Sequence, residues 1–382
     1  MTDTRIFLSG DRSNYRIPSI VVTDRGTVMA FANDRRDTLI DHAPVSWLVM
    51  RRKEIGGSWE ELTVLKQHPG WSCRIESAVY DRETDQTLLF FTRIAVTVDE
   101  FGSYTEEERA RMAREAEERA AEAGLTLGFC MIVSEDDGKT WEERPIASVP
   151  NSLGYIGFTH GSGPGIQLKH GPHAGRLLCP ARYMTGYYTT FDELQIYGFN
   201  NAIYSDDHGK TWISSEPVQA GTGEGVLCEL PDGSILYNSR ASFHDQKRYL
   251  ATSHDGGRSY SDFRTDDFLL EEKNIGCNAS LLCIERGQLK NPSLLPDDTA
   301  SLLLFANPRS EIRSNMTICA SFDEGRTWRE AKTVRPGPCA YSAMAYSEKE
   351  GLVYLLYELG RKGPYDMGLN IACFSLEELL GK

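Results

Sequence analysis

Short segments in which apolar and polar residues alternate recur along the chain, and several of them run into a polar turn rich in Asp and Gly. Three clear examples are LGFCMIVSEDDG (127–138), QIYGFNNAIYSDDHG (195–209) and NMTICASFDEG (315–325). A period of two places successive side chains on opposite faces of an extended strand. The pattern therefore predicts β-strands that lead into hairpin turns.

The polar turns share one eight-residue form, Ser-x-Asp-x-Gly-Lys/Arg-Thr/Ser-aromatic. Its four copies are SEDDGKTW (134–141), SDDHGKTW (205–212), SHDGGRSY (253–260) and SFDEGRTW (321–328), and RKEIGGSW (52–59) is a degraded fifth candidate. Ser and Asp side chains can bond nearby backbone N–H groups, and Gly admits a backbone conformation that a Cβ disfavours. We expect these copies to be structural hairpin turns without a catalytic role.

The spacing between the copies is irregular, which fits a repeated hairpin with variable connections. Repeats that close in a ring leave few exposed sheet edges, as in a β-propeller. Length alone would suggest two or three domains. The repetition favours instead an all-β fold with one repeat-built domain over residues 1–382.

One segment, residues 104–124, breaks the strand pattern and predicts a helix. Thr105 and Glu108 have the spacing of a capping box, and Gly124 stands where the end of a helix is expected. Its alanines form only a narrow apolar stripe. Two interpretations stay open for this helical insertion: a solvated extension of the surface, or a lid or oligomer contact beside a ligand site.

Composition and charge narrow the class of protein. The chain is 40% hydrophobic, which allows a large core, and its net charge of −14 argues against nucleic acid or an anionic membrane as a partner. We find no secretory signal and no run of about 18 apolar residues. Nine single cysteines without CxxC spacing predict reduced thiols and no metal site. We expect a cytoplasmic protein, or a secreted one if a leader has been trimmed.

Several longer motifs make the chain resemble the sialidases, the exo-glycosidases that remove terminal sialic acid. They extend over nearly the whole length and include YRIPSI (15–20), MAFANDRRD (29–37), GSGPGIQL (161–168), GEGVLCELPDGSILYNSR (223–240), GCNASLL (276–282), LLFANPRSEIRSNMTICASFDEGRTW (303–328) and LLYE (355–358). The resemblance implies a six-bladed β-propeller whose chemistry needs no cofactor or metal. The chain departs from these relatives in APVSW (43–47) and in IESAVYD (75–81), where relatives tend to have Asn-Pro.

A sialic acid carries a carboxylate on its anomeric carbon, and arginine binds carboxylates through planar, permanently charged donors. The resemblance implies that Arg16, Arg240 and Arg313 bind this carboxylate. It also implies that Glu358 holds Arg16 in place and that Arg35 lies near the sugar hydroxyls.

A carboxylate nucleophile would be repelled by the carboxylate of the substrate, whereas a tyrosine hydroxyl is neutral until it reacts. The resemblance implies that Tyr341 is the nucleophile and Glu224 its base. It places a general acid in an early loop, where Asp41 is our preferred candidate and Asp37 the competitor. His42 is a candidate to tune Asp41.

The sequence thus predicts a retaining exo-sialidase that hydrolyses terminal α-linked sialic acid, or a closely related nonulosonic acid, from sialylated glycans. One alternative is a hydrolase for a related 2-keto-3-deoxy sugar acid, and another is a non-hydrolytic propeller that binds acidic sugars. The presence of both Tyr341 and Glu224 favours a hydrolase. The linkage, hydrolysis against transfer, and the oligomeric state are left open.

Overall fold

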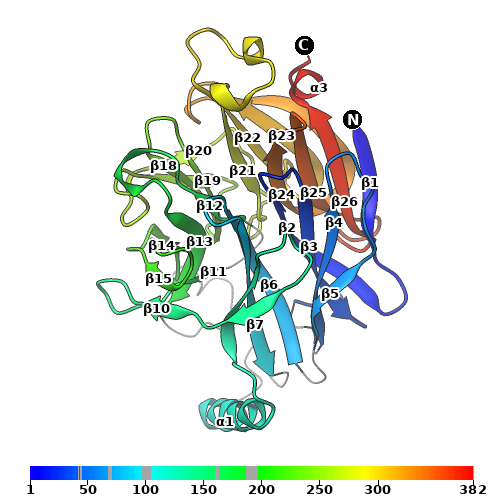
Figure 1. The fold of residues 1–382 in the computed structure, drawn as a ribbon, viewed down its shortest axis with the longest axis vertical. Helices are drawn as coiled ribbons and strands as arrows, with labels where there is room; N and C mark the ends of the chain where they lie inside the picture. The colour runs from blue at the N-terminus through cyan, green and yellow to red at the C-terminus, as the bar shows by residue number, and fades with distance from the viewer. Residues whose placement is uncertain are drawn as a thin grey trace.

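The computed structural model describes residues 1–41, 43, 45–67, 71–95, 105–159, 163–185 and 197–381 of the chain. Within these ranges the chain is folded mainly into strands, which group into four sheets (Figure 1). Helical structure is confined to one longer helix and a few short turns. The predicted all-β class is therefore confirmed.

The first sheet has the order β2-β3-β4-β6-β7-β8-β9, with β5 paired to β4. Its strands are β2 (Ser13–Val22), β3 (Val28–Arg36), β4 (Ser46–Lys53), β5 (Thr63–Lys66), β6 (Trp71–Asp81), β7 (Gln86–Ala95), β8 (Gly128–Ser134) and β9 (Glu142–Arg144). A parallel bridge between Ser46 and Ser72 joins β4 to β6. It connects two antiparallel runs of four strands, β2 to β5 and β6 to β9.

Two further sheets follow along the chain. The second has the order β10-β15-β14-β13-β11, with β12 paired to β13 and β16 to β14, and the third has the order β17-β18-β19-β20. Their strands are β10 (Ala147–Val149), β11 (Phe158–Thr159), β12 (Ile166–Gln167), β13 (Leu177–Met184), β14 (Gly198–Ser205), β15 (Thr211–Ser214), β16 (Gln219–Ala220), β17 (Thr222–Glu229), β18 (Ile235–Ala241), β19 (Arg248–Ser253) and β20 (Ser261–Asp266).

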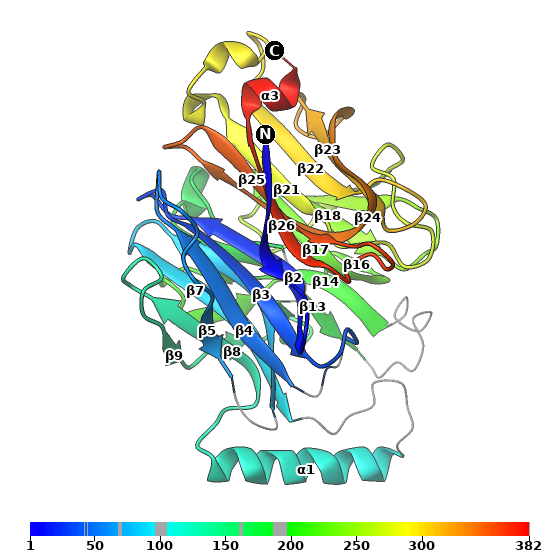
Figure 2. The same ribbon diagram turned by 90° about the vertical axis from the view of Figure 1, so that its right-hand side faces the viewer.

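The last sheet joins the two ends of the described chain in the order β1-β26-β25-β24-β23-β22-β21. Its strands are β1 (Thr2–Leu8), β21 (Ser280–Glu285), β22 (Ser301–Pro308), β23 (Ser314–Ser321), β24 (Arg329–Ser347), β25 (Leu352–Leu359) and β26 (Gly368–Ser375). The long strand β24 pairs with β23 through its first half and with β25 through its second half. Strand β1 completes the sheet beside β26 (Figure 2).

One strand from each of six successive parts of the fold lines a shared cavity of about 170 Å³. These strands are β2, β6, β12, β17, β21 and β24, and each contacts the next, with β24 returning to β2. Buried apolar side chains such as Val79, Phe90 and Ala181 fill the space between neighbouring sheets. Strands arranged around a central cavity are typical of a β-propeller. The number of six blades stays a prediction, because hydrogen bonds merge the strands into four larger sheets.

The four repeated turns connect β8 to β9, β14 to β15, β19 to β20 and β23 to β24. In the last copy Ser321 Oγ donates to Asp323 Oδ1 at 2.8 Å and accepts from the Gly325 N–H at 2.9 Å, and Asp323 Oδ1 accepts from the Thr327 N–H at 2.8 Å. The other copies repeat the two serine bonds. The copies are therefore hairpin turns held by their own side chains, as predicted.

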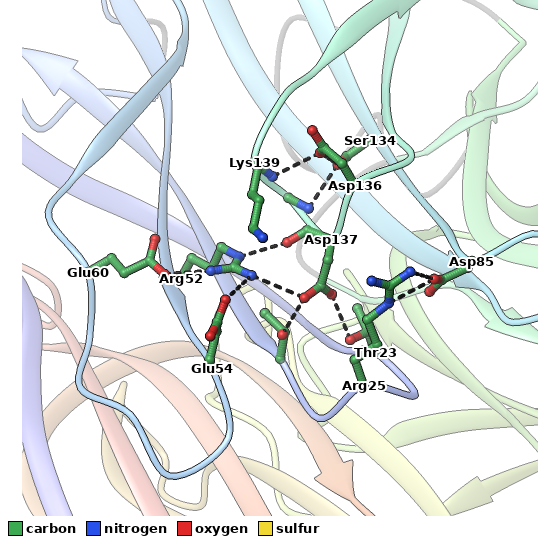
Figure 3. A network of polar contacts seen from close by, with 12 residues as sticks. Thr23, Arg25, Arg52, Glu54, Glu60, Asp85, Ser134, Asp136, Asp137 and Lys139 are labelled. Carbon is green, nitrogen blue, oxygen red and sulfur yellow. Dashed lines mark hydrogen bonds and ion pairs between the residues drawn. The ribbon is translucent and has the colours of Figure 1, made fainter.

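The first copy also ties two runs of strands together (Figure 3). Its Asp137 accepts from Thr23 Oγ1 at 2.9 Å and from Arg52 Nη2 at 3.1 Å. Arg52 opens the degraded fifth candidate, residues 52–59. The turn of that segment is closed by a backbone bond from the Gly57 N–H to the Glu54 oxygen at 2.9 Å. The fifth segment is therefore a turn of a different kind, and its arginine supports the first copy.

Helix α1 (Glu106–Glu122) confirms the predicted insertion and lies at one end of the molecule (Figures 1 and 2). The Thr105 hydroxyl accepts from the Glu108 N–H, and the Glu108 carboxylate accepts from the Thr105 N–H at 2.7 Å. Ala116 and Ala120 are buried against Trp71, so the narrow alanine stripe anchors the helix. The shorter helices are η1 (Gly171–His173), η2 (Arg286–Gln288), η3 (Pro292–Leu294) and α3 (Leu376–Leu380). In the described chain, every helix is too short or too polar to span a membrane.

Candidate active site

The first predicted arginine is fixed by a glutamate from the far end of the sequence. Arg16 of β2 donates from Nε to Glu358 Oε1 at 2.6 Å and from Nη2 to Glu358 Oε2 at 3.3 Å. Both side chains are buried, with 3% and 0% exposed. Glu358 also accepts from the backbone N–H groups of Ile17 at 2.9 Å and Tyr341 at 3.1 Å. One carboxylate therefore holds a buried cation and two strands, β2 and β24.

Tyr341, Glu224 and Arg240 form a compact group. The Tyr341 hydroxyl donates to Glu224 Oε1 at 2.5 Å and accepts from Arg240 Nη1 at 2.7 Å. Arg240 Nη1 also contacts Glu224 Oε2. The tyrosine and the glutamate are buried, at 7% and 6% exposure. The structure thus places the predicted nucleophile and its predicted base in direct contact.

Arg16, Glu224 and Tyr341 each lie at an irregularity of strand pairing. The register shifts lie between residues 16 and 19, 222 and 225, and 339 and 342. At the first of these Pro18 has no N–H to donate, so it cannot continue the ladder. Bulges bend a strand and re-aim its side chains. The three shifts explain how separate strands turn polar groups toward one site.

The three predicted arginines surround the ring of Tyr341. The distance from the guanidinium carbon to the ring centre is 5.6 Å for Arg16, 5.9 Å for Arg240 and 5.5 Å for Arg313. Cationic groups at this distance are attracted to the face of an aromatic ring. Residues from β2, from β18 and from the loop before β23 therefore converge on one tyrosine, as the resemblance implies.

The loop of residues 275–277 orients two of these arginines. Arg240 Nε and Arg313 Nη2 each donate to a carbonyl oxygen of this loop, at 2.7 Å and 3.1 Å. The loop is itself anchored by the buried ion pair of Arg248 and Glu271, because the glutamate accepts from the Cys277 N–H at 2.6 Å. A second buried carboxylate, that of Glu271, thus helps to fix the loop that orients Arg240 and Arg313.

The structure separates the two candidate acids. Asp41 Oδ1 lies 2.7 Å from Arg35 Nη1 and 3.3 Å from Arg16 Nη1, and the aspartate side chain is 68% exposed. Asp37 instead accepts from Arg12 through both of its oxygens at 2.7 Å. The Arg12 guanidinium holds the pKa of Asp37 below its ordinary value. Asp41 therefore faces the arginines, whereas Asp37 is engaged elsewhere on the surface.

Burial and neighbouring charges set the protonation of the group. Burial raises the pKa of Tyr341 well above its ordinary value, Arg240 opposes this effect and Glu224 adds to it. Burial would lower the pKa of Arg16, but Glu358 and Asp41 raise it more, so the net change is upward. Burial would also lower the pKa of Arg240, but Glu224, Tyr341 and Cys277 together raise it more, so the net change is again upward. The phenol is thus neutral at rest beside permanent cations.

Sequence reasoning missed three neighbours of the site. Tyr365 stacks on the guanidinium of Arg16, whose Cζ is 3.6 Å from the ring centre. On β6, Arg74 lies close enough to Asp41, and Glu76 to Glu224, for their charges to interact. The departure at IESAVYD was a signal for Glu76, whereas a lone Tyr in GPYDMG (363–368) carries none. The role predicted for His42 falls outside the described residues.

The cysteines are free thiols. All nine are unpaired, most are buried, and one of them, Cys277, packs against Tyr341. Over the described ranges, no group of three or more His, Cys, Asp or Glu side chains is arranged to hold a metal ion.

The chain is similar in sequence to known sialidases. The profile of the BNR repeat-like domain matches residues 41–355. A sialidase of Micromonospora viridifaciens is 34% identical over 375 residues, which cover 96% of this chain and 52% of the relative, so the chain spans about half the length of that protein. Sialidase-3 of Mus musculus is 27% identical over 414 residues, which cover 96% of this chain and 92% of the relative.

Solved sialidases are similar in fold. The Hadza microbial sialidase Hz136 has a TM-score of 0.72 at 19% identity, with 96% of this chain and 66% of the other covered. The intramolecular trans-sialidase from Ruminococcus gnavus, in complex with oseltamivir carboxylate, has a TM-score of 0.69 at 18% identity, with 98% of each chain covered. At these identities the likeness establishes the fold alone, which is that of the sialidase β-propellers.

Proposed function

Because the chain belongs to the sialidase family of glycoside hydrolases, we propose that it is a retaining exo-sialidase with a tyrosine nucleophile. Its substrate is a terminal α-linked sialic acid, or a closely related nonulosonic acid, on a glycoconjugate. The observation that carries the proposal is the contact of Tyr341 with Glu224 and Arg240 inside a ring of three arginines.

Substrate binding begins with the carboxylate on the anomeric carbon. Arg16, Arg240 and Arg313 offer it charged donors from three directions. Glu358 holds Arg16 along one edge and Tyr365 covers its face, so this side chain loses little freedom when the substrate binds. The local positive charge overrides the net charge of −14 of the whole chain.

In the first step the Tyr341 oxygen attacks the anomeric carbon while Glu224 takes the phenol proton along their 2.5 Å hydrogen bond. Arg240 Nη1, 2.7 Å from the phenol oxygen, stabilises the negative charge that develops there. Asp41 donates a proton to the leaving oxygen, so the aglycone departs as an alcohol. A substrate carboxylate bound to Arg16 offsets the positive charge beside Asp41 and favours its protonated form.

In the second step the Asp41 carboxylate takes a proton from water. The water oxygen attacks the anomeric carbon from the face that the aglycone has left, and Glu224 returns the proton to Tyr341 as the covalent bond breaks. Two successive inversions give overall retention. The exposure of Asp41, 68%, is consistent with a group that meets both the aglycone and solvent.

A fluorogenic α-sialoside and single substitutions test the mechanism. Tyr341→Phe removes the attacking oxygen and should lower kcat about 10³-fold or more. Asp41→Asn should lower kcat about 10²–10⁴-fold with a poor leaving group, and much less with an activated one. Asp37→Asn should behave as the wild type. Comparable turnover by the wild type and Tyr341→Phe would exclude the tyrosine as nucleophile.

Product stereochemistry and direct binding complete the test. NMR at early times should show the sugar released in its α form, and initial release of the β form would contradict a retaining mechanism. Sialoside binding by calorimetry without any product release would identify a sugar-binding propeller instead of a hydrolase.

A further inference from the structure

Two cysteines from different sheets line the central cavity. Cys228 lies on β17 and Cys283 on β21, and both border the cavity of about 170 Å³. Each of these strands is the edge of its own sheet, and the two strands contact each other although no strand pairing joins them in the described chain. The proposed mechanism uses neither thiol, and two neighbouring thiols have a redox chemistry that a single one lacks.

The alternation of side chains along the two strands turns both cysteines into the same core. Residues two apart on a strand share a face. On β17, Val226 and Cys228 pack into the core between the third and the last sheet. On β21, Leu281 and Cys283 pack into that same core. Leu227, between the first two, belongs to a different core on the other side of its sheet. The two thiols therefore enter one core from its facing walls.

A short segment after β12 fixes the two strands at the level of the cysteines. The backbone N–H groups of Lys169 and His170 donate to the Glu229 carboxylate of β17 at 2.7 Å and 3.0 Å. The side-chain nitrogens of the same two residues lie 3.3 Å and 3.1 Å from Glu285 Oε1 of β21. Glu229 directly follows the first cysteine, and Glu285 is two residues beyond the second. The two cysteines therefore lie at nearly the same height along the cavity.

The two thiols differ in their access to solvent. Cys228 is only 3% exposed, whereas Cys283 is half-buried. A hydrogen bond to Cys283, together with burial, raises the pKa of Cys228 well above its ordinary value. Oxidants react with thiolates rather than with thiols. Cys283 is therefore the thiol that a small oxidant meets first, and Cys228 keeps its proton until its neighbour has reacted.

We propose that Cys228 and Cys283 form a modification site, at which hydrogen peroxide produces a reversible disulfide between the third and the last sheet. A cavity of about 170 Å³ has room for several molecules of the size of water, and hydrogen peroxide is only slightly larger. The site lies outside the catalytic group, because Glu224 precedes Cys228 by four residues, or about 13 Å of extended strand.

The reaction has two steps, in which the peroxide is reduced to two water molecules. In the first, the Cys283 sulfur attacks a peroxide oxygen, the O–O bond breaks, and a sulfenic acid and one water are formed. In the second, the Cys228 sulfur attacks the sulfenic sulfur, and its proton leaves with the hydroxyl group as the second water. A dithiol such as dithiothreitol reverses the modification, because it reduces the bond to two thiols and becomes a disulfide itself.

The disulfide closes a large loop of the chain. Residues 228 and 283 are 55 positions apart, and β18, β19 and β20 lie between them. A cross-link of this span restricts the unfolded chain and so stabilises the folded one. It also adds a covalent link between two sheets that share no strand pairing in the described ranges. The modification is therefore expected to strengthen the fold while it leaves the catalytic group in place.

Mass spectrometry and urea unfolding of the native protein test the proposal. The protein is treated with hydrogen peroxide, freed of the oxidant with catalase, denatured, alkylated and digested. The wild type should lose two of its nine free thiols and yield a peptide pair linked through Cys228 and Cys283. Dithiothreitol should restore all nine. The oxidised protein should unfold at a urea concentration about 0.5 M higher than the reduced protein.

Two variants separate the disulfide from other oxidation. In Cys283→Ser, peroxide should neither link Cys228 to another residue nor raise the urea midpoint. Cys373→Ser is the matched control, because Cys373 is also half-buried but packs against a core that contains no other cysteine of the described chain. This control should form the same link as the wild type and gain the same shift.

The wild type alone decides the proposal, so poor folding of a variant does not prevent a decision. If all nine thiols survive the peroxide, or if Cys283 is oxidised to a sulfinic acid without a link to Cys228, the disulfide site is refuted. A linked peptide without a rise in the urea midpoint would refute the stabilising role. No step of this test uses a substrate, so its result is independent of the proposed function.

Discussion

Replacing Glu358 with glutamine tests how far one buried carboxylate supports the site. In the wild type both of its oxygens meet only donors in the contacts described: two nitrogens of Arg16 and the backbone N–H groups of Ile17 and Tyr341. Glutamine has nearly the same volume, so no cavity is created. Its amide nitrogen must however face one of these donors, and the negative charge is lost.

The magnitude follows from the burial of the pair, since Arg16 and Glu358 are 3% and 0% exposed. Removing one partner of a buried ion pair leaves an uncompensated charge and costs about 3–5 kcal/mol. The remaining carboxylate near Arg16 is Asp41 at 3.3 Å, and its side chain is largely in solvent, so it compensates little. We expect Glu358→Gln to lower the free energy of unfolding by this amount and to raise KM.

Urea unfolding followed by tryptophan fluorescence measures the stability, and a fluorogenic substrate measures KM. The control is Glu54→Gln, which removes an exposed carboxylate 2.9 Å from Arg52 and should leave the unfolding midpoint unchanged. If Glu358→Gln unfolds at the same urea concentration as the wild type, the ion pair does not stabilise the fold and our reasoning is wrong.

Three further predictions concern separate parts of the molecule. Burial raises the pKa of Glu76 from 4.5 to about 7, so its stabilising contribution is complete below pH 4.5 and is lost as the pH rises through 7. This loss amounts to about 3 kcal/mol of unfolding free energy. Urea unfolding at pH 4.5 and at pH 7 should show it in the wild type but not in Glu76→Gln. An equal pH dependence in the two proteins would contradict the burial argument. Ser321→Ala leaves the Gly325 N–H without its acceptor and should lower the free energy of unfolding by about 1–3 kcal/mol with kcat/KM unchanged; a wild-type midpoint would show that this bond is dispensable. Gly276→Ala should lower kcat/KM about 10²-fold, because a Cβ there would lie 2.6 Å from Glu271 Oε2 and φ is +67°. Gly287→Ala, which meets nothing within 4 Å, is its control, and equal activity of the two variants would contradict the prediction.

The parts of the fold that depend on local bonds could be predicted from the sequence. The turn of residues 321–328 is closed by bonds between residues at most four apart. The helix start at Thr105 and Glu108 likewise spans three residues. In both cases the residue types that make the bonds stand next to one another in the chain, so their pattern predicts the structure directly.

The contacts of the site are of the opposite kind. Arg16 and Glu358 are 342 residues apart, and Tyr341 and Glu224 are 117 apart. No local pattern pairs them, and their grouping was predicted only through the resemblance to sialidases. Glu76 was not predicted, because a register shift in β6 interrupts the alternation from which its direction would be read.

The closure of the last sheet has a consequence for how the protein is made. Strand β1 pairs with β26, and the Arg5 and Asn370 side chains that meet there are 365 residues apart. On the ribosome β1 therefore emerges about 365 residues before its partner strand exists. Unpaired strands are prone to join other chains. A nascent polypeptide stalled ahead of residue 368 would present this strand to chaperones and proteases, and the synthesis of β26 removes the hazard.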